Sequence, residues 1–227
     1  MHFVIIIVLL IALIVGPGLW VKAIMKRYSL PADRYPWSGG ELARVLLDSL
    51  DLRQVGTETS DIGDHYDPED KVVRLTPQNF DGHSLTAVTV AAHEVGHALQ
   101  DARGYGPLRW RTQLVRWVSP VEKAGAALLM ATPLIIGLTR APAAGLLMFL
   151  GGLLVLGSGV VIHLLTLPTE FDASFERALP MLAQAEILRP GDEPHARRLL
   201  RAAALTYVSA SLMSLLNIAR WWAILRR

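Results

Sequence analysis

The amino-acid sequence predicts a mainly α-helical membrane protein with about four transmembrane helices and a small α+β unit outside the bilayer. Two observations support this prediction. Hydrophobic residues make up 52% of the 227 residues and are concentrated in long runs instead of being spread periodically. Between the first two of these runs lies a soluble stretch that contains His93-Glu94-Val95-Gly96-His97.

The overall charge and the absence of cysteine exclude several classes of protein. The formal net charge is only +2, so the chain lacks the strong basic character typical of nucleic-acid-binding proteins, and we expect no nucleic-acid partner. The chain has no cysteine. This excludes disulfide bonds and metal sites that use thiolate ligands.

The first apolar run, within residues 1–21, predicts a transmembrane anchor, because about 20 apolar residues are needed to cross a bilayer. A cleaved signal peptide is the alternative, but no positive charge precedes the run and no small-residue cleavage site follows it. Lys22, Lys26 and Arg27 come after the run instead. This distribution of charge predicts an uncleaved anchor whose N-terminus lies outside and whose following chain lies in the cytoplasm.

Residues 117–167 predict a transmembrane hairpin, because only a short turn separates the apolar runs 117–138 and 143–167. Residues 204–227 predict a last transmembrane helix. Asn217 and Arg220 interrupt this run, so a slanted interfacial helix is the alternative. The two soluble stretches, residues 28–116 and 168–203, would then share one side of the membrane, and arginines near the membrane in both predict the cytoplasmic side.

Within residues 28–116, the local pattern predicts two helices and a strand. A helix over residues 39–50 begins after Ser38, and a strand covers residues 71–75. A helix over residues 84–103 carries the histidines, with Ser84 or Asp81 as its cap and Gly104 as its end. The strand would be an edge strand that either binds an extended substrate backbone or is purely structural. The hydrophobic face of the first helix consists of Leu42, Val45, Leu46 and Leu50.

The H-E-x-x-H motif predicts a zinc site. His93 and His97 are four residues apart, so on a helix both rings project from one face and can bind the same Zn2+ ion. Glu94 lies one residue further round the helix, where its carboxylate can take a proton from a zinc-bound water. The residues that flank the motif are uncharged, as expected of a buried helix. A buried histidine pair without metal is the alternative.

A catalytic zinc ion needs three protein ligands and one open position. A common peptidase pattern places the third ligand six residues after the second histidine, but that residue here is Arg103. Glu170 follows the predicted hairpin on the correct side of the membrane and is the predicted third ligand, in a helix that would begin at Pro168 and Thr169. Alternatively, Glu170 only complements the dipole of that helix. The rival candidates are Asp172, His65, His83, His195 and, inside an apolar run, His163.

Four segments resemble the YugP-like family of bacterial membrane zinc metallopeptidases. They are Asp64-His65-Tyr66-Asp67-Pro68, residues 91–100, Glu170-Phe171-Asp172-Ala173-Ser174 and Thr206-Tyr207-Val208, and the spacing of the apolar runs is also similar. The resemblance implies a multi-pass zinc peptidase of the bacterial plasma membrane, distantly similar to the gluzincins. It implies a protein or peptide substrate, with membrane proteins among the candidates. An oligomer or a membrane partner protein is compatible with the small residues of the apolar helices.

By the same similarity, His93, His97 and Glu170 would be zinc ligands and Glu94 the base. Gluzincins often have an aspartate four residues after the ligand glutamate, but Ser174 occupies that position, so Asp101 or Asp172 could support a histidine instead.

The sequence offers two candidates for the group that stabilises the tetrahedral intermediate. Tyr207 could direct its hydroxyl at that intermediate or could be an interfacial anchor, and His195 is another candidate. Two other functions are also open: a membrane adaptor with a structural zinc ion, and a zinc hydrolase of a non-peptide amide or ester.

Overall fold

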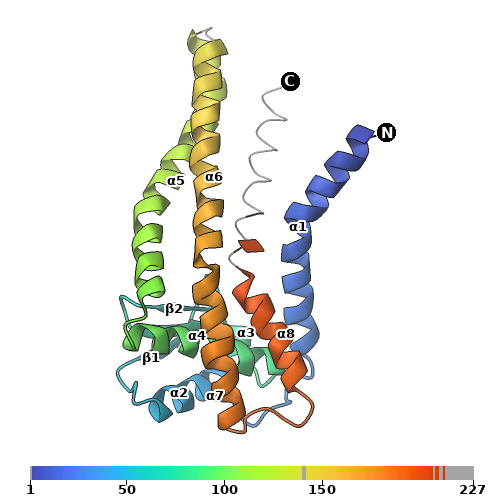
Figure 1. Cartoon of the computed structure of the whole chain (residues 1–227), viewed down its shortest axis with the longest axis vertical. Coiled ribbons are helices and arrows are strands. Elements are labelled where there is room, and N and C mark those ends of the chain that lie inside the picture. The colour runs from blue at the N-terminus through green and yellow to red at the C-terminus, as the bar shows by residue number, and fades with distance from the viewer. Residues whose placement is uncertain (1, 140–141, 207, 210–211, 213–227) are drawn as a thin grey trace. The chain divides into compact units, whose positions relative to one another are not determined.

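The computed structural model describes residues 2–139, 142–206, 208–209 and 212 (Figure 1). These residues are mostly helical and include one small sheet. The elements in chain order are α1 (His2–Tyr28), α2 (Gly39–Ser49), β1 (Gly56–Thr59), β2 (His65–Asp67), β3 (Val72–Leu75), α3 (Pro77–Phe80), α4 (Leu85–Ala102), α5 (Gly106–Thr139), α6 (Pro142–Phe171), the π-helix η1 (Asp172–Ala178), α7 (Leu179–Gln184) and α8 (Glu193–Ala204).

The elements form two units, each built from separate parts of the chain. The sheet unit comprises residues 19–109 and 167–206. The apolar unit comprises residues 1–18 and 110–166, together with the described residues beyond 206. Helices α1, α5 and α6 each contribute residues to both units. Both soluble stretches that the sequence predicts to be catalytic contribute to the sheet unit.

α4 is the central helix of the sheet unit and confirms the helix predicted over residues 84–103. The Ser84 hydroxyl accepts a hydrogen bond from the Ala87 N–H at its start, and Gly104 follows its end with a left-handed φ of +66°. Every residue from Leu85 to Gln100 is buried, because α2, α3, α8, η1 and β3 all contact this helix. Since no side of α4 faces solvent, any polar residue on it needs a partner or a function.

α2 packs on α4 and confirms the helix predicted after Ser38. The Ser38 hydroxyl accepts a hydrogen bond from the Glu41 N–H (3.2 Å), and the Glu41 carboxylate accepts one from the Ser38 N–H (2.8 Å). This reciprocal pair is a capping box. Leu42 and Leu46 are buried as predicted, but Val45 is exposed, so the predicted face is wrong at that position. Leu47 is buried instead, because the apolar stripe follows positions 42, 43, 46 and 47.

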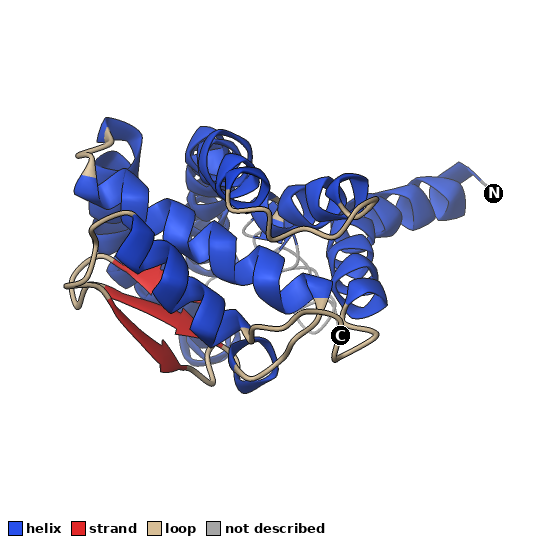
Figure 2. Cartoon of the chain, turned by 90° about the horizontal axis from the view of Figure 1, so that it is seen from below, coloured by secondary structure: helices blue, strands red, loops and turns tan. Residues whose placement is uncertain are grey.

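The three strands form one sheet in the order β1-β3-β2, with β1 parallel and β2 antiparallel to β3 (Figure 2). β3 confirms the strand predicted over residues 71–75. The prediction that this strand lies at an edge was wrong, because β1 and β2 pair with both of its sides. Within the described part of the chain, the outer edges of the sheet belong to β1 and β2, so a substrate could add only there.

Asp101, near the end of α4, joins this helix to the sheet. The Tyr66 hydroxyl donates a hydrogen bond to Asp101 Oδ2 (2.7 Å), and Lys71 forms an ion pair with the same oxygen. Burial, and then the hydrogen bond to Asp101, raise the pKa of Tyr66, because both favour the neutral phenol beside a carboxylate. The hydrogen bonds of Asp101 therefore lead to the sheet, and its predicted role as support for a histidine was wrong.

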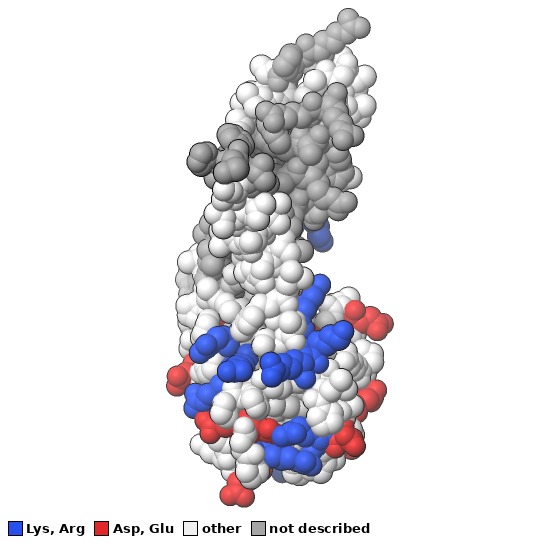
Figure 3. Space-filling view, turned by 90° about the vertical axis from the view of Figure 1, so that its right-hand side faces the viewer, with Lys and Arg blue, Asp and Glu red and all other residues white. Residues whose placement is uncertain are grey.

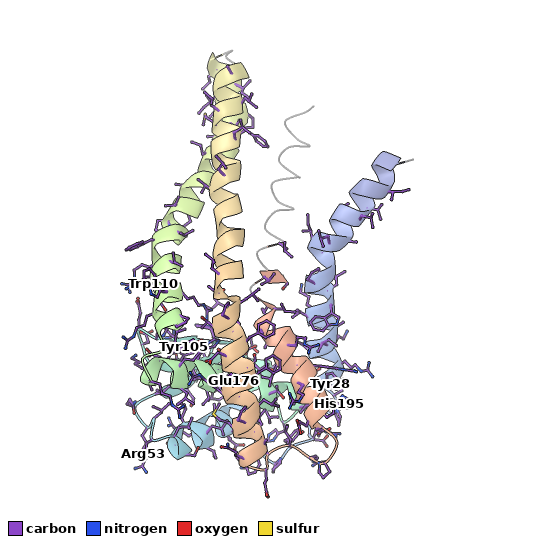
Figure 4. All side chains as sticks on the ribbon, viewed as in Figure 1. Tyr28, Arg53, Tyr105, Trp110, Glu176 and His195 are labelled. Atoms are coloured by element: carbon purple, nitrogen blue, oxygen red, sulfur yellow. The ribbon has the colours of Figure 1, made fainter. Side chains whose placement is uncertain are left out.

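A buried carboxylate connects the loop after α1 to the start of α8. Asp192 is 3% exposed and accepts hydrogen bonds from Arg34 (2.8 and 2.6 Å) and from Tyr35 (2.6 Å). Burial raises the pKa of Asp192, but the hydrogen bonds from Arg34 and Tyr35 outweigh it and lower the pKa overall. Nearby, the Tyr28 hydroxyl of α1 lies 3.0 Å from His195 Nδ1 of α8 (Figure 4).

In the apolar unit, α5 and α6 lie side by side (Figure 1) and touch at glycines. A Cβ atom on Gly145 would overlap Ile136, and one on Gly125 would overlap Val155. The absence of a side chain at these glycines therefore permits the close packing. Large apolar side chains on both helices remain exposed, among them Trp117, Met130, Leu134, Leu138, Leu147 and Leu154.

One helical segment of the described chain, residues 106–138, is long and apolar enough to cross a membrane by its length and composition. The four predicted spans are therefore not confirmed. The predicted turn at residues 140–142 and the fourth run, residues 204–227, fall largely outside the described residues. In Figure 3 the long helices present a surface with few charged side chains, whereas both signs of charge are interspersed over the sheet unit.

Candidate metal centre

Two histidines lie on consecutive turns of α4, as the motif predicts. The side chains of His93 and His97 are 4% and 5% exposed. Their ring centroids are 4.8 Å apart and the ring planes are nearly perpendicular, at 77°. The four-residue separation on a helix therefore brings two buried imidazole rings together on one side of α4.

Glu170 reaches these rings from the end of α6. Its Oε2 atom lies 3.3 Å from His93 Nε2 and 3.2 Å from His97 Nε2, and its side chain is 1% exposed. One ligand atom from each of the three residues lies within 4.8 Å of the others. Two atoms bound to one zinc ion at ~2.0–2.2 Å in a tetrahedral arrangement are about 3.3–3.6 Å apart. The two measured distances are close to this separation.

The donor set fits a divalent metal ion. Imidazole nitrogens and a carboxylate oxygen are usual zinc ligands. A buried carboxylate is costly without a compensating positive charge, which a metal ion would supply. The described residues contribute three members to this group. Three protein ligands leave one position of a tetrahedral ion for a water molecule, as in catalytic zinc sites.

The helix start predicted at Pro168 was wrong. α6 continues through Pro168 to Phe171 and is followed directly by η1, so Glu170 lies near the end of a 30-residue helix. An acidic residue complements the dipole only at a helix N-terminus, so the alternative role for Glu170 is excluded as well. Proline removes one backbone hydrogen bond from a helix. Here the helix continues past Pro168 and changes to π geometry at Asp172, four residues later.

The π-helix η1 orients the residues that follow Glu170. Its hydrogen bonds join residues five apart, so Asp172 and Arg177 lie on one face, and Arg177 Nε donates to Asp172 Oδ2 at 2.6 Å. The backbone of η1 also touches α4, because a Cβ on Gly96 would lie only 2.7 Å from the Ala173 carbonyl oxygen. The glycine inside the H-E-x-x-H motif therefore permits the close approach that brings η1 to the histidines.

The Nδ1 atom of each histidine has its own partner. His97 Nδ1 lies 2.8 Å from Gln100 Oε1, and His93 Nδ1 lies 3.1 Å from Ser174 Oγ. Ser174 thus contacts a histidine from the position where gluzincins often have aspartate. Asp172 reaches His97 only through Gln100, whose Nε2 donates to Asp172 Oδ2 at 2.7 Å. Sequence reasoning did not identify Gln100, although its position three residues after His97 places it on the same side of the helix.

Glu94 lies next to His93 on α4 and is 6% exposed. This carboxylate is therefore shielded from bulk solvent. Its position one residue from His93, a candidate ligand, is compatible with the predicted role as a base.

The other candidates lie elsewhere or outside the described residues. His65 and His83 contact backbone carbonyl oxygens through Nδ1, and His195 lies beside Tyr28. None of these three belongs to the metal group that the described residues form. The side chain of His163 and all of Tyr207 lie outside the described residues, so the predicted role of Tyr207 stays a prediction.

Comparisons with known proteins indicate the same class of site. The family model described as "Putative neutral zinc metallopeptidase" matches residues 3–226. A protein of Bacillus subtilis (strain 168), named "Putative membrane protease YugP", is 36% identical over 203 residues, which cover 88% of this chain and 86% of that protein. No solved structure matches the chain.

Proposed function

The chain belongs to the neutral zinc metallopeptidase family, and from this premise we propose that it is an integral-membrane zinc endopeptidase. His93, His97 and Glu170 would bind the zinc ion, and Glu94 would be the general base. The observation that carries the proposal is the pair of distances, 3.3 and 3.2 Å, between Glu170 Oε2 and the two histidine Nε2 atoms in a buried site.

The proposed chemistry divides between the metal and Glu94. When bound, zinc would lower the pKa of a coordinated water molecule and polarise the substrate carbonyl. Glu94 accepts the proton that the attacking water loses, and it then delivers that proton to the leaving amine. The burial of Glu94 supports this role, because a shielded carboxylate keeps the proton within the site between the two steps.

The number of ligands favours a catalytic zinc site over a structural one. Structural zinc sites are normally closed by four protein ligands. The group in the described residues has three members, which leaves a position for water. The adaptor with a structural zinc ion is therefore the weaker alternative.

Three observations support a membrane location. The similar Bacillus subtilis protein is named a membrane protease, one described helix is long and apolar enough to span a bilayer, and apolar side chains remain exposed on α5 and α6. We propose four spans, within residues 1–21, 117–138, 143–167 and 204–227. The positive charges of Lys22, Lys26 and Arg27 after the first span support a catalytic unit on the cytoplasmic side of the plasma membrane.

The proposed substrate is an extended segment of a protein or peptide. β2 is the favoured edge for strand addition, because the Tyr66–Asp101 hydrogen bond fastens it to the helix that carries the histidines. Tyr207 is the proposed donor to the tetrahedral intermediate. Replacing it by phenylalanine would lower kcat by about 10²–10³-fold without loss of zinc if that role is correct.

Glu94→Gln tests the mechanism. Cleavage of casein and of a peptide library by the full chain in detergent would fall by at least 10²–10⁴-fold, because the general base is lost, while bound zinc would remain stoichiometric. Glu193→Gln is the matched control, since Glu193 is an exposed glutamate that pairs with Arg197 on the surface of α8. Full activity of Glu94→Gln would remove Glu94 from the mechanism. If the unaltered chain cleaves ester or non-peptide amide probes but no peptide, it is a zinc hydrolase of those substrates and not a peptidase.

A further inference from the structure

The side-chain amide of Gln100 has all its hydrogen-bonding groups engaged around His97. Gln100 is fully buried. Its Nε2 atom lies 2.9 Å from the Thr169 carbonyl oxygen and 2.7 Å from Asp172 Oδ2. Both of these partners are acceptors, so they use the two amide N–H groups. The amide orientation is therefore determined by its neighbours, and Oε1 is the atom that faces His97.

This orientation decides which nitrogen of His97 carries the proton. Gln100 Oε1 can only accept a hydrogen bond, and it lies 2.8 Å from His97 Nδ1. Nδ1 must therefore be the N–H of the ring. Nε2 is the atom that faces Glu170, at 3.2 Å. With a metal ion between these two atoms, a proton on Nδ1 leaves the Nε2 lone pair for the metal, whereas without the ion the carboxylate oxygen can only accept a hydrogen bond from a protonated Nε2.

Ser174 has the same effect on His93 by a different route. Its hydroxyl has one hydrogen, which it donates to the Leu200 carbonyl oxygen of α8 at 3.1 Å. The Ser174 oxygen is then an acceptor towards His93 Nδ1, also at 3.1 Å. His93 Nδ1 therefore carries the proton, and the lone pair is left on Nε2, which lies 3.3 Å from Glu170 Oε2.

We propose that Gln100 and Ser174 are positioning residues that hold His97 and His93 in the Nδ1–H tautomer, so that both Nε2 atoms are ready to bind metal. A metal-ligating histidine normally donates its other N–H to a fixed acceptor, and loss of that acceptor typically costs about 10–100-fold in metal affinity. Here the acceptors are an amide and a hydroxyl. Each is oriented by a third group: Asp172 and the Thr169 carbonyl for the amide, and the Leu200 carbonyl for the hydroxyl.

The π-helix places these groups. Arg177 and Asp172, five residues apart in η1, are paired at 2.6 Å, and this pairing keeps the Asp172 carboxylate directed at Gln100. Ser174 follows Asp172 by two residues and reaches the other histidine. One short segment of the chain therefore orients both rings, while Glu170, just before it, contributes the third ligand. The proposal depends on one part of the proposed function, the binding of a metal ion by His93, His97 and Glu170.

The experiment compares the full chain with Gln100→Met and Ser174→Ala. Methionine is close to glutamine in volume, but its thioether sulfur is only a weak acceptor for the His97 N–H, and alanine removes the hydroxyl oxygen of Ser174. Asp101→Asn is the matched control, because Asp101 is also on α4 but bonds to Tyr66 and Lys71. Helical circular dichroism verifies that each variant is folded.

Two quantities are measured on each protein. The first is the tautomer of each ring in the metal-free protein, from nitrogen NMR of histidine-labelled samples. The second is the Zn2+ dissociation constant, from competition with a chelator. We expect Nδ1–H for both rings in the unaltered chain. We also expect a tautomer mixture at His97 in Gln100→Met and at His93 in Ser174→Ala, and a zinc affinity about 10–100-fold weaker in each variant.

Three results would overturn the proposal: rings without a proton on Nδ1 in the unaltered chain, unchanged protonation of Nδ1 in both variants, or zinc affinities equal to that of Asp101→Asn. These outcomes are separate from the fate of the proposed function. If the chain binds zinc with both rings in the Nδ1–H form but Glu94→Gln leaves cleavage unchanged, the peptidase mechanism fails while the roles of Gln100 and Ser174 stand.

Discussion

Gly96 lies at a close contact between α4 and η1, so Gly96→Ala perturbs the candidate metal centre without removing any of its three candidate ligands. The added Cβ would lie 2.7 Å from the Ala173 carbonyl oxygen, whereas ordinary contact begins at 3.4 Å, so α4 and η1 must separate by up to 0.7 Å. The obstructing atom belongs to the backbone and cannot rotate away. Ala173 lies between Glu170 and Ser174 in the chain, so both of these residues move with it.

The expected effect on metal binding is larger than the effect on stability. Overpacking of this kind costs about 1–3 kcal/mol, and alanine regains about 1 kcal/mol over glycine inside a helix, so unfolding stability falls by about 0–2 kcal/mol. Zinc sites, in contrast, tolerate deviations of only about 0.2 Å in ligand distance. Zinc affinity should therefore fall by at least about tenfold, since loss of the hydrogen-bond partner of a metal-bound histidine alone has an effect of that size.

The assay is chelator competition for zinc, with thermal unfolding measured on the same samples. Gly106→Ala is the matched control, because nothing lies within 4 Å of a Cβ at that position. If Gly96→Ala binds zinc as tightly as Gly106→Ala, the contact between α4 and η1 does not position the candidate ligands.

Three further predictions concern the predicted third ligand, the buried carboxylate and the packing of α5 against α6. Glu170→Ala should abolish stoichiometric zinc binding measured by metal analysis, and undiminished binding would assign the third ligand elsewhere. Asp192→Asn should reduce stability at neutral pH by about 2–4 kcal/mol, because it removes a buried partner of Arg34 and Tyr35. Since the folded state lowers the pKa of Asp192, its stabilisation is fully present above the usual aspartate pKa of about 3.9 and is lost as the pH falls through the lowered pKa. The free energy of unfolding, measured from pH 7 to 3, should therefore fall less steeply with acid for Asp192→Asn than for the unaltered chain. Parallel pH dependences of the two proteins would contradict a lowered pKa of Asp192. Gly145→Leu should destabilise the packing of α5 against α6 by at least about 1–3 kcal/mol through its clash with Ile136, whereas Gly137→Leu, with open space around it, should not. Equal thermal stability of these two variants would exclude tight packing at Gly145.

The local features of the site could be predicted from the sequence because they depend on neighbours along the chain. Ser84 caps the start of α4, and Gly104 follows its end with a left-handed φ, as such residues commonly do at helix ends. The four-residue spacing brings His93 and His97 together by helix geometry alone. Glu170 was predicted by counting the ligands that zinc requires, and the structure does bring it to the histidines.

The errors come from pairings that the local sequence does not encode. β3 is central because β1 and β2, which are short and polar, pair with it through tertiary contacts. Pro168 resembles a helix start, yet α6 continues through it, because the surrounding structure outweighs the loss of one backbone hydrogen bond. Gln100 and Ser174 carry no motif of their own. Their roles depend on the π-helical register of η1 and on the Leu200 carbonyl oxygen, which is 26 residues further along the chain than Ser174.

We propose that His93, His97 and Glu170 together bind one zinc ion and leave one of its positions open. Zinc X-ray absorption of the zinc-loaded full chain, beside Glu170→Ala, tests it most directly. We expect four-coordinate zinc with two imidazole nitrogens at about 2.0–2.1 Å and oxygen at the remaining positions, and a changed or vanishing spectrum in Glu170→Ala. A closed site with a third or fourth imidazole, or an identical spectrum in the two proteins, would contradict it.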